Sequence, residues 1–313
     1  MHKHLEYIST VAMPRDVWLA HRRQSIGGSD AAAVAGLSDW ASPYSVWADK
    51  RGLLPAEPEN EAMRQGRDFE DYVARRWSAA KGKRVRRRNA IIINPDYPFA
   101  HANVDRLVVD EDAGLECKTT SSLNLQRFRN GDYPANYYAQ CVHYLAVTGA
   151  ARWYLAVLVY GRGYFEFVIE RSDVEADIAE LMKQEAVLWE HVKNGTPPPV
   201  DGHDATTDAL KTIYAGSDGG AVELFGQEAV LAGYFMDKTI RDEAEQRMET
   251  ARQTLMSDLG DNELGICGGH KIIWKPQNRQ TFDAKRFALD NPTADLSRYY
   301  KTSTYRKFEI KEV

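Results

Sequence analysis

The segment VDRLVVDEDAGLECKTT, residues 104–120, decides the fold that we expect. Its β-branched runs lie on either side of a turn at residues 110–114, which predicts two strands joined in a hairpin. Asp105 lies on the first strand, and Glu116 and Lys118 lie two residues apart on the second. Because side chains alternate between the two faces of a strand, Glu116 and Lys118 share one face. The hairpin therefore predicts two carboxylates and a lysine in one place.

This group of side chains suits metal-dependent hydrolysis. Two carboxylates on paired strands form an oxygen-rich site of the kind that Mg²⁺ or Mn²⁺ prefers, and they leave positions for water and a substrate phosphate. A neighbouring lysine can hold and polarise the attacking water while the metal stabilises the developing oxyanion. The structural alternative for Glu116 and Lys118 is an exposed charge pair, which contributes little free energy. Cys117, between them, points to the opposite face, toward the apolar layer.

Two amphipathic helices are expected around this hairpin. Residues 60–81 place apolar and aromatic side chains at near-helical spacing, and the helix that they predict carries Glu70. Residues 133–148 predict a second helix, which carries Gln140. A further hairpin and a further helix are predicted at residues 152–171 and 172–194. This order of helices and strands predicts an α/β fold of the mixed α+β type.

A domain boundary is predicted near residue 205. Residues 195–208, GTPPPVDGHDATTD, combine prolines with small polar residues and break the periodicity of the chain, which is typical of a linker. We expect one domain over residues 1–204 and a smaller C-terminal module over residues 205–313. That module should contain one long charged helix, within residues 223–260, and a small α+β piece.

The composition restricts the function classes. The three cysteines among the 313 residues are widely separated and form no C-x-x-C pair, so neither a disulfide framework nor a zinc or iron–sulfur site is expected. No apolar stretch approaches the roughly 18 residues of a membrane span, and the N-terminus resembles no secretory signal, which predicts a cytoplasmic protein without membrane contact. A net charge of -5 argues against coating nucleic acid by bulk attraction, although local patches can still bind phosphate.

One such patch is predicted at residues 22–30, RRQSIGGSD. Arg22 and Arg23 can bind phosphate oxygens bidentately. Ser29 and the amides of the Gly-Gly turn at a helix start can form an anion-binding nest. The structural alternative is that Ser29 or Asp30 caps the helix and that the arginines form a solvated helix end.

A basic run, KGKRVRRR, occupies residues 81–88 and ends in Arg86, Arg87 and Arg88. Runs of this kind usually form a solvated face, but they also follow the DNA backbone. Because the run adjoins the predicted helix of Glu70, we treat these three arginines as candidate DNA-binding residues.

Five pieces of the sequence, taken in order, resemble one nuclease family. The pieces RRQSIGGSD, GRDFE, NVDRL, LECK and YYAQCVHY are similar to the PD-(D/E)xK nuclease superfamily and, within it, to the lambda exonuclease and YqaJ-like viral recombinase group. They lie within residues 15–170. The resemblance implies a restriction-endonuclease-like core, in which a central mixed sheet is flanked by helices. The proline that names the motif is replaced here by Val104, a position that shapes the strand and binds no metal.

The resemblance also implies roles for individual residues. Asp105 and Glu116 match the metal-binding carboxylates, Lys118 the catalytic lysine, and Gln140 the glutamine that supports the site. Glu70 matches a helix glutamate that lies near the DNA or near the metal, which it reaches through a water.

Two further features follow from the resemblance. The backbone carbonyl of Cys117 would complete the metal coordination. The region of Arg22 and Ser29 would form the pocket for a terminal 5′-phosphate.

The function implied by the resemblance is a metal-dependent 5′ to 3′ exonuclease of phage or prophage origin. It would act on double-stranded DNA ends in a bacterial host and leave 3′ single-strand overhangs for recombination. A ring-shaped homo-oligomer, with a trimer favoured, and a single-strand annealing protein are the implied partners. The alternatives are a PD-(D/E)xK endonuclease and a catalytically silent DNA-end-binding protein. The presence of Glu70, Asp105, Glu116 and Lys118 argues against the silent protein.

Overall fold

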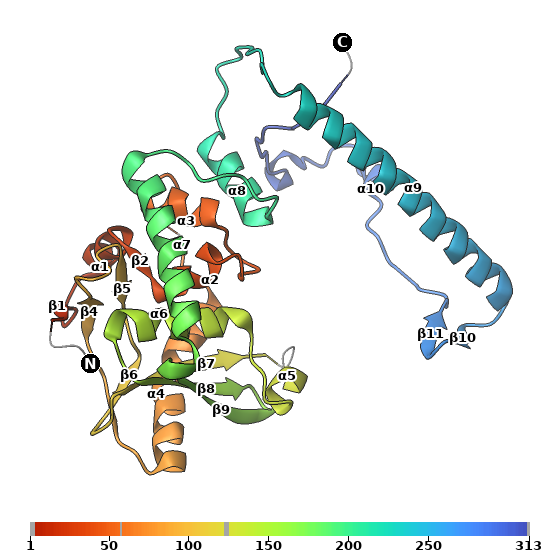
Figure 1. The fold of residues 1–313 in the computed structure, drawn as a ribbon. Helices are drawn as coiled ribbons and strands as arrows, with labels where there is room; N and C mark the ends of the chain where they lie inside the picture. Colours follow the sequence, from red (N-terminus) through yellow and green to blue (C-terminus); the bar gives the residue numbers. More distant parts are fainter. Residues whose placement is uncertain (1–3, 57, 122–124, 312–313) are drawn as a thin grey trace. The chain divides into compact units, whose positions relative to one another are not determined.

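The computed structural model of the chain describes residues 4–56, 58–121 and 125–311 (Figure 1). The chain divides into two compact units, Met1–Ala215 and Gly216–Val313. The first unit contains all of the candidate catalytic side chains, and the two units are described separately.

The central sheet of the first unit has five strands in the order β3-β6-β7-β8-β9. Strands β7 and β8 pair in parallel, and the other neighbours pair antiparallel, so the sheet is mixed as expected. The hairpin predicted within residues 104–120 is confirmed as the pair β6 and β7. The strands are β3 (Val85–Arg86), β6 (Arg106–Val108), β7 (Ala113–Thr120), β8 (Arg152–Val159) and β9 (Gly163–Glu170).

A smaller sheet of four strands has the order β1-β4-β5-β2. Its short strand β2 pairs in parallel with β5, which sets Gly27 beside His101. Because Asp105 follows β5 closely in the chain, this pairing brings the RRQSIGGSD segment toward the hairpin of the central sheet. The strands are β1 (Glu6–Ser9), β2 (Ile26–Gly27), β4 (Ala90–Ile93) and β5 (Ala100–Ala102).

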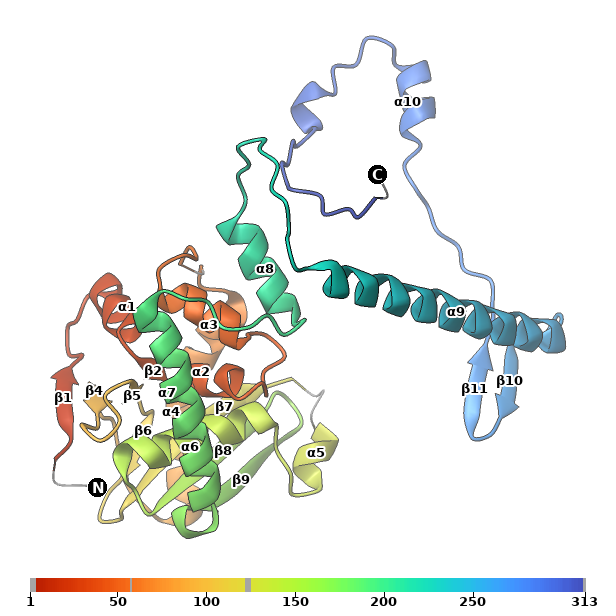
Figure 2. The same cartoon turned by 45° about the horizontal axis from the view of Figure 1, so that its top comes forward.

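Helices cover both faces of the central sheet (Figures 1 and 2). Helix α4 (Glu61–Lys81) lies on one face and buries Trp77 against Leu115 and Tyr154. The Asn60 side chain caps its start, and Gly82 ends it at φ 64°, a left-handed conformation that suits glycine. The opposite face is covered by α6 (Ala135–Thr148), and α7 (Glu175–Asn194) packs over α6. The mixed α+β core predicted from the sequence is confirmed.

The remaining helices of the first unit are short: α1 (Arg15–Arg23), α2 (Gly28–Val34), α3 (Pro43–Lys50), α5 (Leu125–Arg129), the 3₁₀ turn η2 (Arg171–Asp173) and α8 (Asp204–Ile213). Helix α8 packs on α3, where Ala209 is buried and Thr206 donates a hydrogen bond from Oγ1 to Ser42 Oγ at 2.7 Å. The boundary that we expected before residue 205 thus precedes a helix that packs in the first unit.

The second unit contains the long helix α9 (Glu228–Leu259), on which the described side chains are exposed except near its C-terminal end and at a few half-buried positions. A two-stranded hairpin and two short helical segments follow: β10 (Leu264–Cys267), β11 (His270–Ile273), α10 (Ala284–Asp290) and η3 (Ser297–Tyr299). Within the described ranges of the chain, no helix is both long enough and apolar enough to span a membrane.

Candidate active site

Glu116 and Lys118 come together as the alternation of β7 requires. Glu116 is 2% exposed, and its Oε1 lies 2.7 Å from Lys118 Nζ. The same ammonium group donates a hydrogen bond of 2.7 Å to Gln140 Oε1 on α6. Asp105 precedes β6, and its Oδ2 accepts a hydrogen bond of 2.8 Å from the backbone N–H of Cys117 on β7. The structure thus gathers Asp105, Glu116, Lys118 and Gln140 at the middle of the central sheet.

Burial and charge change the protonation of this cluster. Burial raises the pKa of Asp105 well above its usual value, and the charges of Glu116 and Glu70 raise it further. Burial alone would lower the pKa of Lys118, but the carboxylates of Glu116 and Asp105 outweigh burial and raise it. The lysine therefore stays protonated near neutral pH, and the cluster holds more negative than positive charge when both carboxylates are ionised.

The donor set of the cluster fits a hard divalent cation. Within the described residues, Glu116 Oε2 is buried and has no hydrogen-bond partner, which is costly for a carboxylate oxygen. A cation held between Asp105 and Glu116 would satisfy this oxygen with ligands that Mg²⁺ and Mn²⁺ prefer. In the part of the chain that the structure describes, no three His, Cys, Asp or Glu side chains meet as a metal site. Further ligands would therefore be backbone oxygens, water or phosphate, and the Cys117 carbonyl remains a prediction.

The Cys117 side chain takes the direction expected from the strand. It packs on the α4 side of the sheet with the cluster of Val73, Trp77 and Leu115. Burial raises the pKa of its thiol well above the usual value, and the Asp105 carboxylate adds to this effect. The thiol is thus a neutral packing group, while its backbone lies in the site.

Glu70 lies beside this cluster but is held by an arginine that the sequence interpretation missed. Arg106 Nη1 donates a hydrogen bond to Glu70 Oε1, and Arg106 Nη2 donates one of 3.0 Å to Asp71 Oδ1. The Arg106 side chain is only 4% exposed. Its position directly after Asp105 in NVDRL was the available sequence signal. An arginine that is buried against two acidic residues fixes the place of Glu70.

A basic pocket of about 270 Å³ adjoins Glu70 and Asp105. Arg87 and Arg88 of the predicted basic run line it together with Arg67 and Arg106. The third predicted arginine, Arg86, is exposed on β3 and is not among the lining residues. Two members of the basic run are thus brought to the candidate site, and Arg67 of α4, which sequence reasoning had not singled out, joins them.

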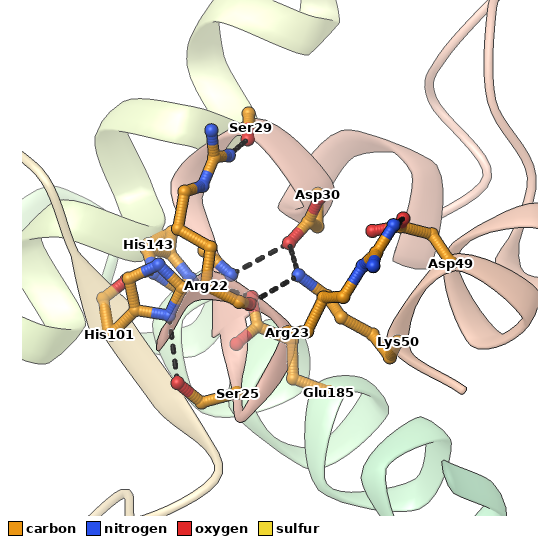
Figure 3. Close-up of polar contacts among 11 residues, drawn as sticks. Arg22, Arg23, Ser25, Ser29, Asp30, Asp49, Lys50, His101, His143 and Glu185 are labelled. Atoms are coloured by element: carbon orange, nitrogen blue, oxygen red, sulfur yellow. Dashed lines mark hydrogen bonds and ion pairs between the residues drawn. The ribbon is translucent and has the colours of Figure 1, made fainter. Parts of the chain in front are cut away.

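The predicted phosphate pocket is assembled around Arg22 and Ser29 (Figure 3). Arg22 NH2 donates a hydrogen bond to Ser29 Oγ, and its guanidinium lies 4.7 Å from the ring centroid of Trp18. Arg23 points away to Asp49, with NH2 3.2 Å from Oδ1 (Figure 3). The structure therefore brings Arg22 and Ser29 together and engages Arg23 elsewhere.

The start of α2 differs from the expectation that Ser29 or Asp30 is its N-cap. Helix α2 begins at Gly28, so its N-cap is the preceding residue, Gly27. Asp30 instead reaches back, and its Oδ2 accepts a hydrogen bond of 2.9 Å from the Gly27 backbone N–H. Ser29 is thus left free of the capping role and faces Arg22.

An ion pair between the buried Lys50 and the half-buried Asp30 lies beside this pocket (Figure 3). Lys50 Nζ lies 2.6 Å from Asp30 Oδ2 and donates a hydrogen bond of 3.0 Å to the Arg22 carbonyl. Burial opposes ionisation of Asp30, but the charges of Lys50 and Arg22 outweigh it and lower the pKa of this carboxyl. Sequence reasoning missed Lys50, since no local pattern links α3 to the end of α1. Lys50 thus contacts the backbone of Arg22 and the side chain of Asp30, which is the neighbour of Ser29.

Tyr144 of α6 connects the phosphate pocket to the carboxylate cluster. Its hydroxyl accepts a hydrogen bond of 2.9 Å from Gln140 Nε2 and donates one of 2.8 Å to the Asn103 carbonyl. The backbone of Gly28 packs so closely on its ring that an added Cβ would lie 2.5 Å from Cε1. Glycine at this position is therefore required by packing. Tyr144 therefore contacts both the phosphate pocket, at Gly28, and the carboxylate cluster, at Gln140.

The sequence of this chain matches a known protein family. Residues 17–151 match the model of the YqaJ-like viral recombinase domain, and all of the predicted site residues lie in that range. A relative from Bacillus subtilis (strain 168), the uncharacterized protein YqaJ, is 36% identical over 307 residues, which cover 96% of this chain and 95% of that protein.

Solved structures with a similar fold include an alkaline exonuclease from Laribacter hongkongensis, LHK-Exo, with a TM-score of 0.50 and 23% identity. The match covers 58% of this chain and 94% of that chain. The structure of LHK-Exo in complex with dAMP matches with a TM-score of 0.50 and 24% identity over the same shares. At these levels of identity, both matches show a similarity of fold.

Proposed function

Because this chain belongs to the YqaJ-like viral recombinase family, we propose that it is a metal-dependent 5′ to 3′ exonuclease that acts on double-stranded DNA ends. The family and the exonuclease fold support a nuclease role. The observation that carries the proposal is the pairing of the buried Glu116 with Lys118, next to the half-buried Asp105 that lines a basic pocket. The product would be a 3′ single-strand overhang suited to recombination.

The chain's own residues divide the chemistry among them. Asp105, Glu116 and the Cys117 carbonyl would hold Mg²⁺ or Mn²⁺, and the ion would supply a nucleophile near neutral pH and neutralise phosphate charge. Lys118 would orient the attacking water through its ammonium group, which lies beside Glu116. Gln140 holds the lysine in place.

Glu70 and the arginines around it would meet the DNA. Glu70 is fixed by Arg106 at the edge of the basic pocket, where a water can link it to the metal. Arg87 and Arg88 would contact backbone phosphates, as would Arg67. Arg86, which is exposed on β3 outside this pocket, remains a proposed contact to the DNA backbone.

Direction of cleavage would come from the phosphate pocket. A terminal 5′-phosphate offers more charge and more acceptor oxygens than an internal diester, and it can replace Ser29 as the partner of the Arg22 guanidinium. Since Tyr144 contacts both Gly28 and Gln140, the pocket and the carboxylates keep a fixed separation. A strand whose end is bound would thus be cut at a constant position.

The proposed assembly is a ring-shaped homo-oligomer, a trimer, that encloses the duplex and keeps the enzyme on it. The second unit would recruit a single-strand annealing protein. Helix α9 suits such a role because it exposes Val230, Tyr234 and Met248 along its length.

One assay separates this proposal from its alternatives. Linear and closed circular duplexes of the same sequence are incubated with the full chain and Mg²⁺, and matched reactions contain EDTA. We expect degradation of the linear duplex alone, and none in EDTA. Cleavage of the circle would indicate an endonuclease, and binding of linear ends without cleavage would indicate a silent end-binding protein. Either result would overturn the proposed activity.

A further inference from the structure

A further pocket, of about 510 Å³, lies between α4 and the turn that joins β8 to β9. Phe69, Tyr72 and Arg76 of α4 line one side, and Tyr160 and Arg162 of the turn line the other. Phe69 is 40% exposed and Tyr72 is 44% exposed. Large aromatic side chains that stay exposed beside arginines form the kind of surface on which nucleobases stack.

The rings of this aromatic pocket contact one another edge to face. The centroids of Phe69 and Tyr160 are 5.5 Å apart at an interplanar angle of 63°, and those of Phe69 and Tyr72 are 6.5 Å apart at 87°. Because the rings are not stacked face on face, ring faces remain for an added planar group.

The pocket also offers positive charge. Neither Arg76 nor Arg162 forms an ion pair with an acidic side chain in the described residues, so both charges are available to a ligand. The Arg76 guanidinium lies 4.6 Å from the ring centroid of Tyr164, which holds it beside the pocket. Planar ring faces and unpaired guanidinium groups together match a base and its phosphate.

The pocket lies next to the candidate active site, on the other flank of α4 from the basic pocket. Phe69, Tyr72 and Arg76 follow the i, i+3, i+7 spacing of one helical stripe, whereas Arg67 and Glu70 line the basic pocket. In the central sheet, Lys118 pairs with Val157, and the next two residues of β8 line the aromatic pocket. Helix α4 thus lines a basic pocket with Arg67 and Glu70, and an aromatic pocket with Phe69, Tyr72 and Arg76.

We infer that this aromatic pocket binds an unpaired nucleotide of the DNA end, with its base stacked on Phe69 or Tyr160 and its phosphate on Arg162. The inference rests on the proposed nuclease function and extends it to a single-strand subsite. A base can stack on a protein ring only after it has left its pair, so the ligand is not intact duplex. The unpaired nucleotide comes from the uncut 3′ strand or is the released mononucleotide, and both share this chemistry.

The test compares two DNA ends and uses the full chain in EDTA, so that no cleavage takes place. Dissociation constants are measured for a blunt duplex and for the same duplex with a four-nucleotide 3′ overhang. We expect the overhang to tighten binding by roughly tenfold, as one or two stacked bases would. Tyr160→Leu and Arg162→Gln should bring this ratio close to one, while Tyr305→Leu, at an exposed tyrosine of the second unit, should leave it unchanged.

A second readout reports stacking directly. An overhang that carries 2-aminopurine should lose fluorescence on binding to the unaltered chain and keep it on binding to Tyr160→Leu. Competition by dAMP against the overhang would assign the pocket to the released nucleotide, and its absence would assign the pocket to the uncut strand.

The outcomes separate the inference from the function on which it rests. The ratio of the dissociation constants for blunt and overhang duplexes could be the same in the unaltered chain and in both pocket variants. If the affinity for blunt duplex is normal, this result would overturn the aromatic subsite alone. Failure of the unaltered chain to bind any DNA end would overturn the proposed function and the subsite with it.

Discussion

Lys118 Nζ lies 2.7 Å from Glu116 Oε1, and the two residues are two positions apart on one strand. Their side chains meet because they share one face of β7, and Gln140 of α6 holds the ammonium group there. The lysine is thus an integral part of the carboxylate cluster and cannot turn to solvent without leaving Glu116 buried and unpaired.

Glu116→Gln and Asp105→Asn should each abolish cleavage while binding of DNA ends persists. Each change removes a charged candidate ligand and leaves the side-chain size almost unchanged. We expect the rate to fall by more than about 100-fold, the loss seen even for groups that only support a metal ligand. Glu111→Gln, in the turn of the same hairpin, is the control and should cleave normally. Rates within a few-fold of the unaltered chain for Glu116→Gln would remove Glu116 from the site.

Arg22→Ala should reduce the preference for 5′-phosphorylated ends, because charge-assisted hydrogen bonds to phosphate contribute about 1.5–3 kcal/mol. Arg23→Ala is the matched control, since Arg23 is held by Asp49. The measurement is the ratio of degradation rates on duplexes with 5′-phosphate and 5′-hydroxyl ends. An unchanged ratio for Arg22→Ala would show that the arginine does not read the end.

Lys50→Met should destabilise the first unit by about 3–5 kcal/mol, since it leaves Asp30 without its buried partner. Lys183→Met, which breaks an exposed ion pair on α7, should change the free energy of unfolding by less than about 1 kcal/mol. Urea denaturation of the full chain measures both. The double variant Asp30→Asn with Lys50→Met should recover part of the loss, and no recovery would argue against the ion pair as the cause.

His101 should make the protein less stable as the pH falls. Burial and the nearby charge of Lys50 lower the pKa of His101 to about 3, below the value of about 6.5 for an unfolded chain. Between about pH 6.5 and 3, the unfolded chain binds a proton at this histidine that the folded chain does not. The free energy of unfolding is therefore highest above about pH 6.5 and falls toward pH 3, by up to about 1.4 kcal/mol per pH unit. His101→Asn should therefore show a shallower loss of unfolding free energy between about pH 6.5 and 4.5. Equal slopes for the two proteins would contradict this.

A fragment of residues 1–215 should fold and cleave DNA, because the candidate catalytic side chains lie in the first unit. A fragment of residues 1–204 lacks α8 and should melt at a lower temperature, since it exposes the surface of α3 that Ala209 and Thr206 cover. Thermal unfolding and nuclease assays of both fragments test this. If residues 1–215 fold without cleaving, the second unit contributes to catalysis.

The sequence by itself determined the features that depend on local periodicity. A period of two placed Glu116 and Lys118 on one face and turned Cys117 to the apolar layer. A helical period of apolar residues located α4 and α6, which carry Glu70 and Gln140. These patterns repeat over a few residues, so they can be recognised without knowledge of distant segments.

Only the tertiary structure decided which distant side chains became partners. Arg22 and Arg23 are adjacent in sequence, yet one faces Ser29 and the other Asp49. Lys50 reaches Asp30 only because α3 packs beside the start of α2, and no repeat in the sequence marks that contact. Arg86 pairs with Leu107 of β6, whereas Arg87 follows the strand and lines the basic pocket. Such pairings depend on how the sheets and helices pack, which is a property of the whole chain and not of any local pattern.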